Sequence, residues 1–197
     1  MRHSRPVLGY EFECRVSSFT PGTHNPNPEP MTTLFRTMRH AAILVAVAAA
    51  PALAQDLGIA VGEQAPGGPL ETLAGQAVDL STFLGKQQPT VIEFWATWCG
   101  NCKQLEPAMR AAHATYGKTV RFVTVAVSVN QSVERVRAWQ AVNKVPGELL
   151  YDRKGTVSGA YDVPATSYVV IADKRGKIVY TGVGGTQNLE AAIKKAM

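Results

Sequence analysis

The stretch Phe94-Trp95-Ala96-Thr97-Trp98-Cys99-Gly100-Asn101-Cys102-Lys103 places two cysteines, separated by two residues, directly after a run of aromatic side chains. Residues 90–96 are apolar, β-branched or aromatic with one exception, and this pattern predicts a buried strand. From about Gly100 to Tyr116 apolar residues recur every three or four positions, which predicts a helix. The cysteine pair is therefore expected where a strand turns into the start of a helix.

Strands and helices are also expected to alternate in the rest of the chain. Pro107 lies inside the predicted helix and should kink it, because proline lacks the backbone donor and crowds the preceding turn. Further strands are predicted at residues 120–129, 149–151, 167–172 and 177–183. Further helices are predicted after the candidate N-cap Asn130, ending near residues 146–147, and at residues 189–196. This alternation predicts an α/β domain with a central, mixed β-sheet flanked by helices.

Residues 31–54 have the pattern of a secretory signal. A basic region follows Met31, an apolar run covers residues 41–50, and Ala52-Leu53-Ala54 fits a small-x-small cleavage site. The apolar run is far shorter than the ~20 residues that span a bilayer, so we favour cleavage after Ala54 over an uncleaved membrane anchor. We interpret the polar, proline-rich residues 1–30 as a non-native or disordered extension. An irregular lead-in at residues 55–70 and a domain at residues 71–197 are then expected.

Charge and cysteine content narrow the function of the predicted mature chain. Residues 55–197 contain 15 basic and 12 acidic side chains, a mild excess that does not predict nucleic-acid binding. Cys14 precedes the predicted signal, so only Cys99 and Cys102 remain. A secreted chain with a single close pair has no disulfide framework of the kind that supports small secreted domains. The two cysteines are therefore expected to function together at one site and not as a framework that holds distant segments together.

A metal or haem site is disfavoured by the ligands available. Structural zinc needs four ligands, and residues 55–197 add only one histidine, His113, to the two cysteines. Covalent haem attachment needs a histidine directly after the second cysteine, where this chain has Lys103. We therefore predict neither a metal nor a cofactor.

A redox centre accounts for more of the pattern. At a helix N-terminus, Cys99 would lie near unpaired N–H groups that favour a thiolate, and it is the candidate exposed nucleophile. Cys102, one turn further, shares a helix face with Cys99 and is placed to resolve a mixed disulfide. The two are then expected to alternate between dithiol and disulfide.

Glu93 is the candidate proton acceptor. It lies six residues before Cys99, inside the predicted apolar strand. A carboxyl group there is costly unless it is hydrogen-bonded or has a raised pKa, and a raised pKa suits a group that takes the proton from Cys102. The alternative is an edge-strand glutamate that points to solvent.

Taken together, residues 94–103, Pro107 and the acidic residue at position 93 resemble the active site of the thioredoxin superfamily. The flanking segments at 80–86, 130–152 and 173–177 look like its secreted, redoxin-like branch of periplasmic thiol-disulfide reductases, several of which serve cytochrome c maturation. The resemblance covers roughly residues 60–197. It implies a thioredoxin fold with a helix-strand insert, protein thiols and disulfides as substrates, and a membrane-embedded thiol electron donor; we further expect a monomer.

The sequence differs from the family pattern at two places. Between the cysteines the family often has a proline, whereas this chain has Gly100-Asn101, so reductant, oxidant and isomerase remain open. The family also has a cis-proline beside the disulfide. An ungapped spacing puts Ser167 at that place with Thr166 before it, whereas Pro164 comes three residues early. Either the loop is shortened and Pro164 is the cis-proline, or the cis-proline is absent; we favour its absence, with Ser167 in a trans peptide at that place. With Trp98, these residues form the candidate substrate-binding surface.

The favoured function is a periplasmic thiol-disulfide oxidoreductase that acts as a reductant and contributes to cell redox homeostasis. One alternative is a thiol peroxidase, which would need a threonine three residues before its cysteine, where this chain has Ala96. The other is a periplasmic copper carrier that uses the same two thiols, since thiolates suit Cu(I).

Overall fold

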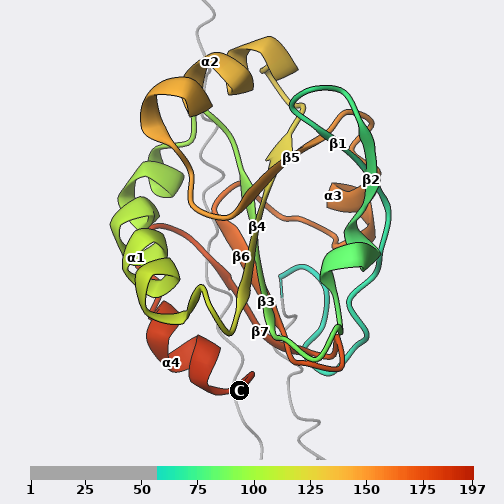
Figure 1. Cartoon of the computed structure of the whole chain (residues 1–197), viewed down its shortest axis with the longest axis vertical. Coiled ribbons are helices and arrows are strands. Elements are labelled where there is room, and N and C mark those ends of the chain that lie inside the picture. Colours follow the sequence, from blue (N-terminus) through green and yellow to red (C-terminus); the bar gives the residue numbers. More distant parts are fainter. Residues whose placement is uncertain (1–56) are drawn as a thin grey trace, which may run out of the picture. The chain divides into compact units, whose positions relative to one another are not determined.

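A seven-stranded mixed sheet forms the centre of the computed structural model, which describes residues 57–197 (Figure 1). The predicted extension at 1–30 and the predicted signal at 31–54 lie outside the described residues. The strands are β1 (Pro69–Thr72), β2 (Ala77–Asp79), β3 (Thr90–Trp95), β4 (Arg121–Val127), β5 (Glu148–Asp152), β6 (Tyr168–Ala172) and β7 (Ile178–Val183). The helices are the 3-10 turn η1 (Leu80–Phe83), α1 (Gly100–Tyr116), α2 (Val133–Asn143), α3 (Thr156–Ala160) and α4 (Leu189–Lys194).

The sheet has the order β2-β1-β5-β4-β3-β6-β7. Its three central strands β5, β4 and β3 are parallel, and every other pairing is antiparallel. Strand β3, which leads to the cysteines, therefore lies between β4 and β6, with Glu93 opposite Thr124 on one side and Val169 on the other. The predicted α/β architecture, a mixed sheet flanked by helices, is confirmed.

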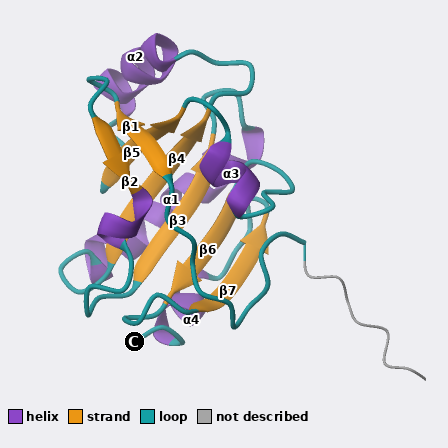
Figure 2. Cartoon of the chain, turned by 90° about the vertical axis from the view of Figure 1, so that its right-hand side faces the viewer, coloured by secondary structure: helices purple, strands orange, loops and turns teal. Residues whose placement is uncertain are grey.

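The helices cover both faces of this sheet. Helices α1 and α4 lie on one face and α3 on the other, as Figure 1 and the rotated view in Figure 2 show. Side chains alternate between the two cores, because successive residues of a strand point to opposite faces. In β3, Val91 joins the core under α1 and α4, whereas Ile92 and Phe94 join the core on the other face. Within residues 57–197, no helix is both long and apolar enough to cross a bilayer.

Helix α2 and helix α3 differ from the sequence-based expectation. Helix α2 begins at Val133, after the N-cap Ser132, whose side chain accepts from the N–H of Arg135 at 3.3 Å. The prediction of Asn130 as the N-cap was wrong: the cap is Ser132, and Asn130 lies two residues earlier with a left-handed φ of 54°, whereas N-caps have extended backbone. Helix α3 was not predicted, since five residues containing Gly159 carry too little periodicity to show in a sequence.

Candidate active site

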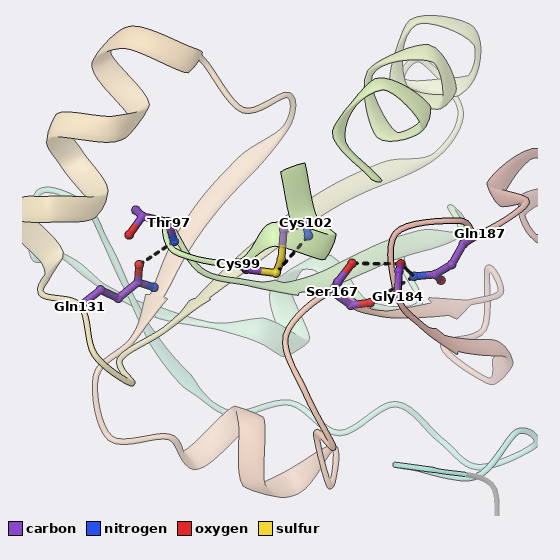
Figure 3. Close-up of a disulfide and its surroundings, with 7 residues drawn as sticks. All are labelled: Thr97, Cys99, Cys102, Gln131, Ser167, Gly184 and Gln187. Atoms are coloured by element: carbon purple, nitrogen blue, oxygen red, sulfur yellow. Dashed lines mark hydrogen bonds between the residues drawn. A yellow bond between two sulfur atoms is a disulfide. The ribbon is translucent and has the colours of Figure 1, made fainter. Parts of the chain in front are cut away.

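Cys99 and Cys102 form a disulfide at the start of α1, with a Cα–Cα distance of 5.3 Å (Figure 3). Cys99 is the N-cap of the helix, and its Sγ accepts a hydrogen bond from the backbone N–H of Cys102 at 3.0 Å. This sulfur therefore lies among the unpaired N–H groups of the first turn, where negative charge is stabilised. The site is built so that a thiolate on Cys99 would already have a backbone donor.

Cys99 is not exposed in this disulfide form. Its residue surface is only 3% accessible, and Cys102 is buried as well, which corrects the expectation of an exposed nucleophile. In this form the Cys99 sulfur is bonded to Cys102 and accepts from its N–H, within the helix turn that Cys99 caps. The neighbouring Trp98 is the exposed aromatic residue of the motif, with 42% of its surface accessible.

The turn between β3 and α1 is held from the opposite loop. The buried side chain of Gln131 accepts from the N–H of Thr97 at 2.8 Å and donates to the carbonyl of Val127 at 2.6 Å. The indole N–H of Trp98 donates to the carbonyl of Val129 at 2.9 Å. These bonds attach the residues before Cys99 to the β4–α2 loop, so the motif has a fixed position at the end of the sheet.

Glu93 lies inside the protein, on the strand that leads to the cysteines. Its accessible surface is 5%, and its Oε1 atom has no hydrogen-bond partner. Burial, together with the nearby negative charge of Glu106, raises the pKa of Glu93 to about 8. The solvent-facing alternative is therefore wrong, and the carboxyl group can take up or release a proton near neutral pH.

The loop before β6 contains the residues considered above for the place of the family's cis-proline. Pro164 is exposed, Thr166 is half-buried and Ser167 is fully buried. All peptide bonds of the described chain are trans, and Ser167 has a φ of 66°. Strand β6 begins one residue later, at Tyr168.

Ser167 is fixed by four hydrogen bonds. Its N–H donates to the carbonyl of Phe94 at 2.8 Å, and its Oγ donates to the carbonyl of Gly184 at 3.0 Å. Its own carbonyl accepts from the N–H of Gly184 and from the side chain of Gln187, both at 3.1 Å. Figure 3 shows Ser167, Gly184 and Gln187 on one side of the disulfide and Thr97 and Gln131 on the other.

A cavity of about 250 Å³ lies beside the motif. Trp98 and Thr166 line it, together with Val127 at the end of β4, Val129 in the β4–α2 loop and Val163. The structure thus brings together two of the predicted surface residues, whereas Pro164 does not line the cavity and Ser167 is turned into the protein. The lining is largely apolar, which suits an uncharged side chain of a partner.

Three residues of the site were missed by sequence reasoning: Gln131, Gln187 and Glu106. Gln131 and Gln187 act through side-chain bonds to backbone groups 34 and 20 residues away. Neither glutamine lies in a motif, so no local signal could have found it. Glu106 did have a signal, because it lies one turn beyond Cys102 on the helix that faces Glu93.

Metal ligands do not gather in the described part of the chain. No group of three or more His, Cys, Asp or Glu side chains within residues 57–197 is arranged to hold a metal ion. The two sulfurs are joined to each other in this structure.

Comparison with known proteins places these features in a family. Residues 61–181 match the model of the AhpC/TSA family. Thioredoxin-like protein YneN of Bacillus subtilis (strain 168) is 34% identical over 131 residues, which are 66% of this chain and 75% of that protein. Thiol-disulfide oxidoreductase ResA of the same organism is 30% identical over 126 residues, which are 64% of this chain and 69% of ResA.

A solved structure agrees in fold. The crystal structure of a protein described as a putative thiol:disulfide interchange protein DsbE, from Chlorobium tepidum, superimposes with a TM-score of 0.62 and 26% identity. The superposition covers 70% of this chain and 98% of that one. The two proteins are therefore similar in fold over most of the described chain.

Proposed function

The chain belongs to the AhpC/TSA family and is a thiol-disulfide oxidoreductase of thioredoxin fold, and from this premise we propose that it reduces protein disulfides in the periplasm. The observation that carries the proposal is the position of Cys99 as N-cap of α1, with its sulfur 3.0 Å from the N–H of Cys102. A sulfur in that place is favoured as a thiolate, which is the attacking form.

The reaction uses the two cysteines and Glu93 in turn. In the dithiol form the Cys99 thiolate attacks one sulfur of a substrate disulfide, which forms a mixed disulfide and releases the first substrate thiolate. Glu93 accepts the proton of Cys102, whose sulfur then attacks Cys99. The second substrate thiolate leaves, and the Cys99–Cys102 disulfide of this structure is the product.

The substrate chain is expected to dock across Trp98 and Thr166. Both line the apolar cavity beside the motif, and Trp98 is the exposed aromatic residue next to Cys99. Ser167 stabilises this surface, because its hydrogen bonds to Phe94 and Gly184 fix the loop that contains Thr166. Pro164 lies at the exposed start of the same loop.

Location and electron supply complete the proposal. The signal pattern at residues 31–54 supports export, and a membrane-embedded thiol carrier would then return electrons to the disulfide. The protein acts as a monomer, and cytochrome c maturation supplies one class of substrate, the disulfide of a CxxCH haem-attachment segment. N-terminal sequencing of the exported protein should find Gln55 first; a mature chain that retains residues 1–30 would contradict the assigned signal.

The deciding experiment combines turnover with the reduction potential. Purified residues 55–197 should reduce insulin disulfides with a dithiol donor, Cys99→Ser should abolish the reaction, and the Cys99–Cys102 potential should lie near the reducing values of thioredoxins, about −270 mV. A potential near −120 mV would identify an oxidant instead. Cu(I) titration and hydroperoxide consumption, measured on the same preparation, distinguish the copper-carrier and peroxidase alternatives: tight stoichiometric copper without turnover would overturn the proposal.

A further inference from the structure

A small internal cavity lies beside the buried Glu93. Its volume is about 20 Å³, and its walls come from β3, β4, α1 and the region around α2. Glu93 and Glu106 line it together with Thr124, Met109 and Trp139. Most of the lining is apolar, but with Glu93, Glu106 and Thr124 in its walls a cavity of this size has room and polar partners for one water molecule. The cavity therefore joins the buried carboxyl group to a second one on α1.

Glu106 is held at the outer side of this cavity. Its side chain is 31% accessible. The Oε1 atom of Glu106 accepts two hydrogen bonds from Arg110, from Nε at 2.9 Å and from Nη2 at 2.6 Å. Arg110 also donates to the carbonyls of Asn143 and Lys144, at 2.5 and 3.1 Å. Arg110 thus ties α1 to the end of α2 and keeps the Glu106 carboxylate between cavity and solvent.

The proposed reaction leaves a proton on Glu93 after each resolution step. That proton can return to the Cys102 thiolate when the disulfide is reduced again, whereas a route to solvent would let Glu93 ionise independently of Cys102. Glu93 itself is buried, with an Oε1 atom that has no partner. A proton cannot leave a buried carboxyl group at a useful rate without a polar neighbour or a water molecule to receive it.

We propose that Glu106 is the proton-exchange partner of Glu93, acting through one water molecule in the cavity that the two residues share. The water takes the proton from Glu93 Oε1 and gives its own to the Glu106 carboxylate, which passes it to solvent. Glu93 ends as a carboxylate and the water is restored. Glu106 contacts neither substrate nor sulfur, so it is a positioning residue for proton transfer; its role rests on the proposed function of Glu93.

Electrostatics around the cavity agree with this route. Glu106 is the charged residue among the cavity walls, and its carboxylate contributes to the raised pKa of Glu93, after burial. The remaining walls are uncharged, and Val169, the neighbour of Glu93 on β6, is apolar. Arg110 bonds to Glu106 and does not line the cavity.

The test is the rate of proton exchange at Glu93, measured by carboxyl ¹³C relaxation dispersion in the full oxidised domain near pH 8. Glu106→Gln keeps the size and an oxygen for Arg110 but cannot accept the proton, so the exchange rate should fall by roughly tenfold or more. Glu106→Asp, which keeps the acid, should restore part of it. The matched control is Glu190→Gln, which removes another i,i+4 ion-paired glutamate, bonded to Lys194 on α4.

Each outcome supports or overturns the proposal. Exchange at Glu93 that slows in Glu106→Gln, and not in Glu190→Gln, supports it. Equal exchange rates in wild type and Glu106→Gln overturn it, whatever happens to stability. A separate measurement, the rate of mixed-disulfide resolution in Glu93→Gln, tests the role of Glu93 itself. An unchanged resolution rate would show that Glu93 does not accept the proton of Cys102. The exchange experiment would still show whether protons pass between Glu93 and Glu106.

Discussion

The backbone N–H of Ser167 donates to the carbonyl of Phe94 at 2.8 Å, which ties the loop before β6 to the strand that ends at the redox motif. Phe94 lies five residues before Cys99, so this bond fixes the loop relative to the disulfide. Ser167 makes it in a left-handed backbone conformation, with a φ of 66°. The position at which the resemblance suggests a proline is therefore occupied by a residue whose N–H is in use.

Ser167→Pro should destabilise the protein by about 3 kcal/mol or more, because proline has no N–H and its φ is fixed near −65°. Ser167→Gly should change the free energy of unfolding by less than about 1 kcal/mol, since glycine tolerates the positive φ and offsets the lost Oγ bond. Urea denaturation of both variants measures the difference. Equal stability of Ser167→Pro and wild type would show that the loop can adopt another conformation.

The stability of the oxidised protein should fall as pH rises from about 5 to 8. The pKa of Glu93 is raised from 4.5 to about 8, so over this range the folded state holds a proton that the unfolded state has lost. The full loss is on the order of 5 kcal/mol and levels off above the folded pKa. Glu93→Gln should remove this slope. Urea titrations at several pH values check it, and parallel curves for the two proteins would contradict the raised pKa.

Asn101→Pro should make the protein more reducing. Asn101 lies in the first turn of α1, where its N–H has no carbonyl partner within the helix and can therefore stabilise a Cys99 thiolate. Removing it raises the pKa of Cys99 and destabilises the reduced form, which lowers the potential by on the order of 10 to 20 mV. Equilibration with glutathione measures the change. Asn101→Ala keeps the N–H and serves as the control; a higher potential for Asn101→Pro would contradict the account.

Trp98→Ala should lower kcat/KM for insulin reduction by roughly tenfold and leave the potential nearly unchanged. The indole lies exposed beside Cys99, lines the apolar cavity and bonds to the carbonyl of Val129 at 2.9 Å. Its loss removes docking area worth about 1 to 2 kcal/mol. Trp98→Phe keeps most of the area and loses only the hydrogen bond, so it should retain most of the activity. Steady-state assays with a protein and with a small disulfide separate docking from chemistry: equal losses for both substrates would place Trp98 in the chemical step.

Much of the site lies in one continuous segment, and that part could be predicted. The strand to helix transition around residues 90–116 follows from periodicity, and it puts Cys99 at the N-cap where the structure has it. For Glu93 the sequence left two alternatives, a buried carboxyl group in an apolar strand and a solvent-facing edge residue, and the structure shows the buried one. These predictions succeeded because sequence neighbours share one strand and one helix.

The surroundings of the motif depend on contacts between distant segments, which a single sequence does not reveal. The hydrogen bonds of Gln131 to Thr97 and of Gln187 to Ser167 join elements that become neighbours only through the sheet order. The burial of Cys99 in the disulfide form likewise comes from the surrounding fold.

The sequence by itself determined the cysteine pair, its place at a helix start and the acidic residue in the preceding strand, because these rest on spacing within one strand and one helix. Only the tertiary structure decided that Ser167 is anchored to Phe94 and that Glu93 shares a cavity with Glu106. Such relationships arise when the sheet brings β3, β4, β6 and α1 together, and side-chain packing between them has no periodic trace along the chain.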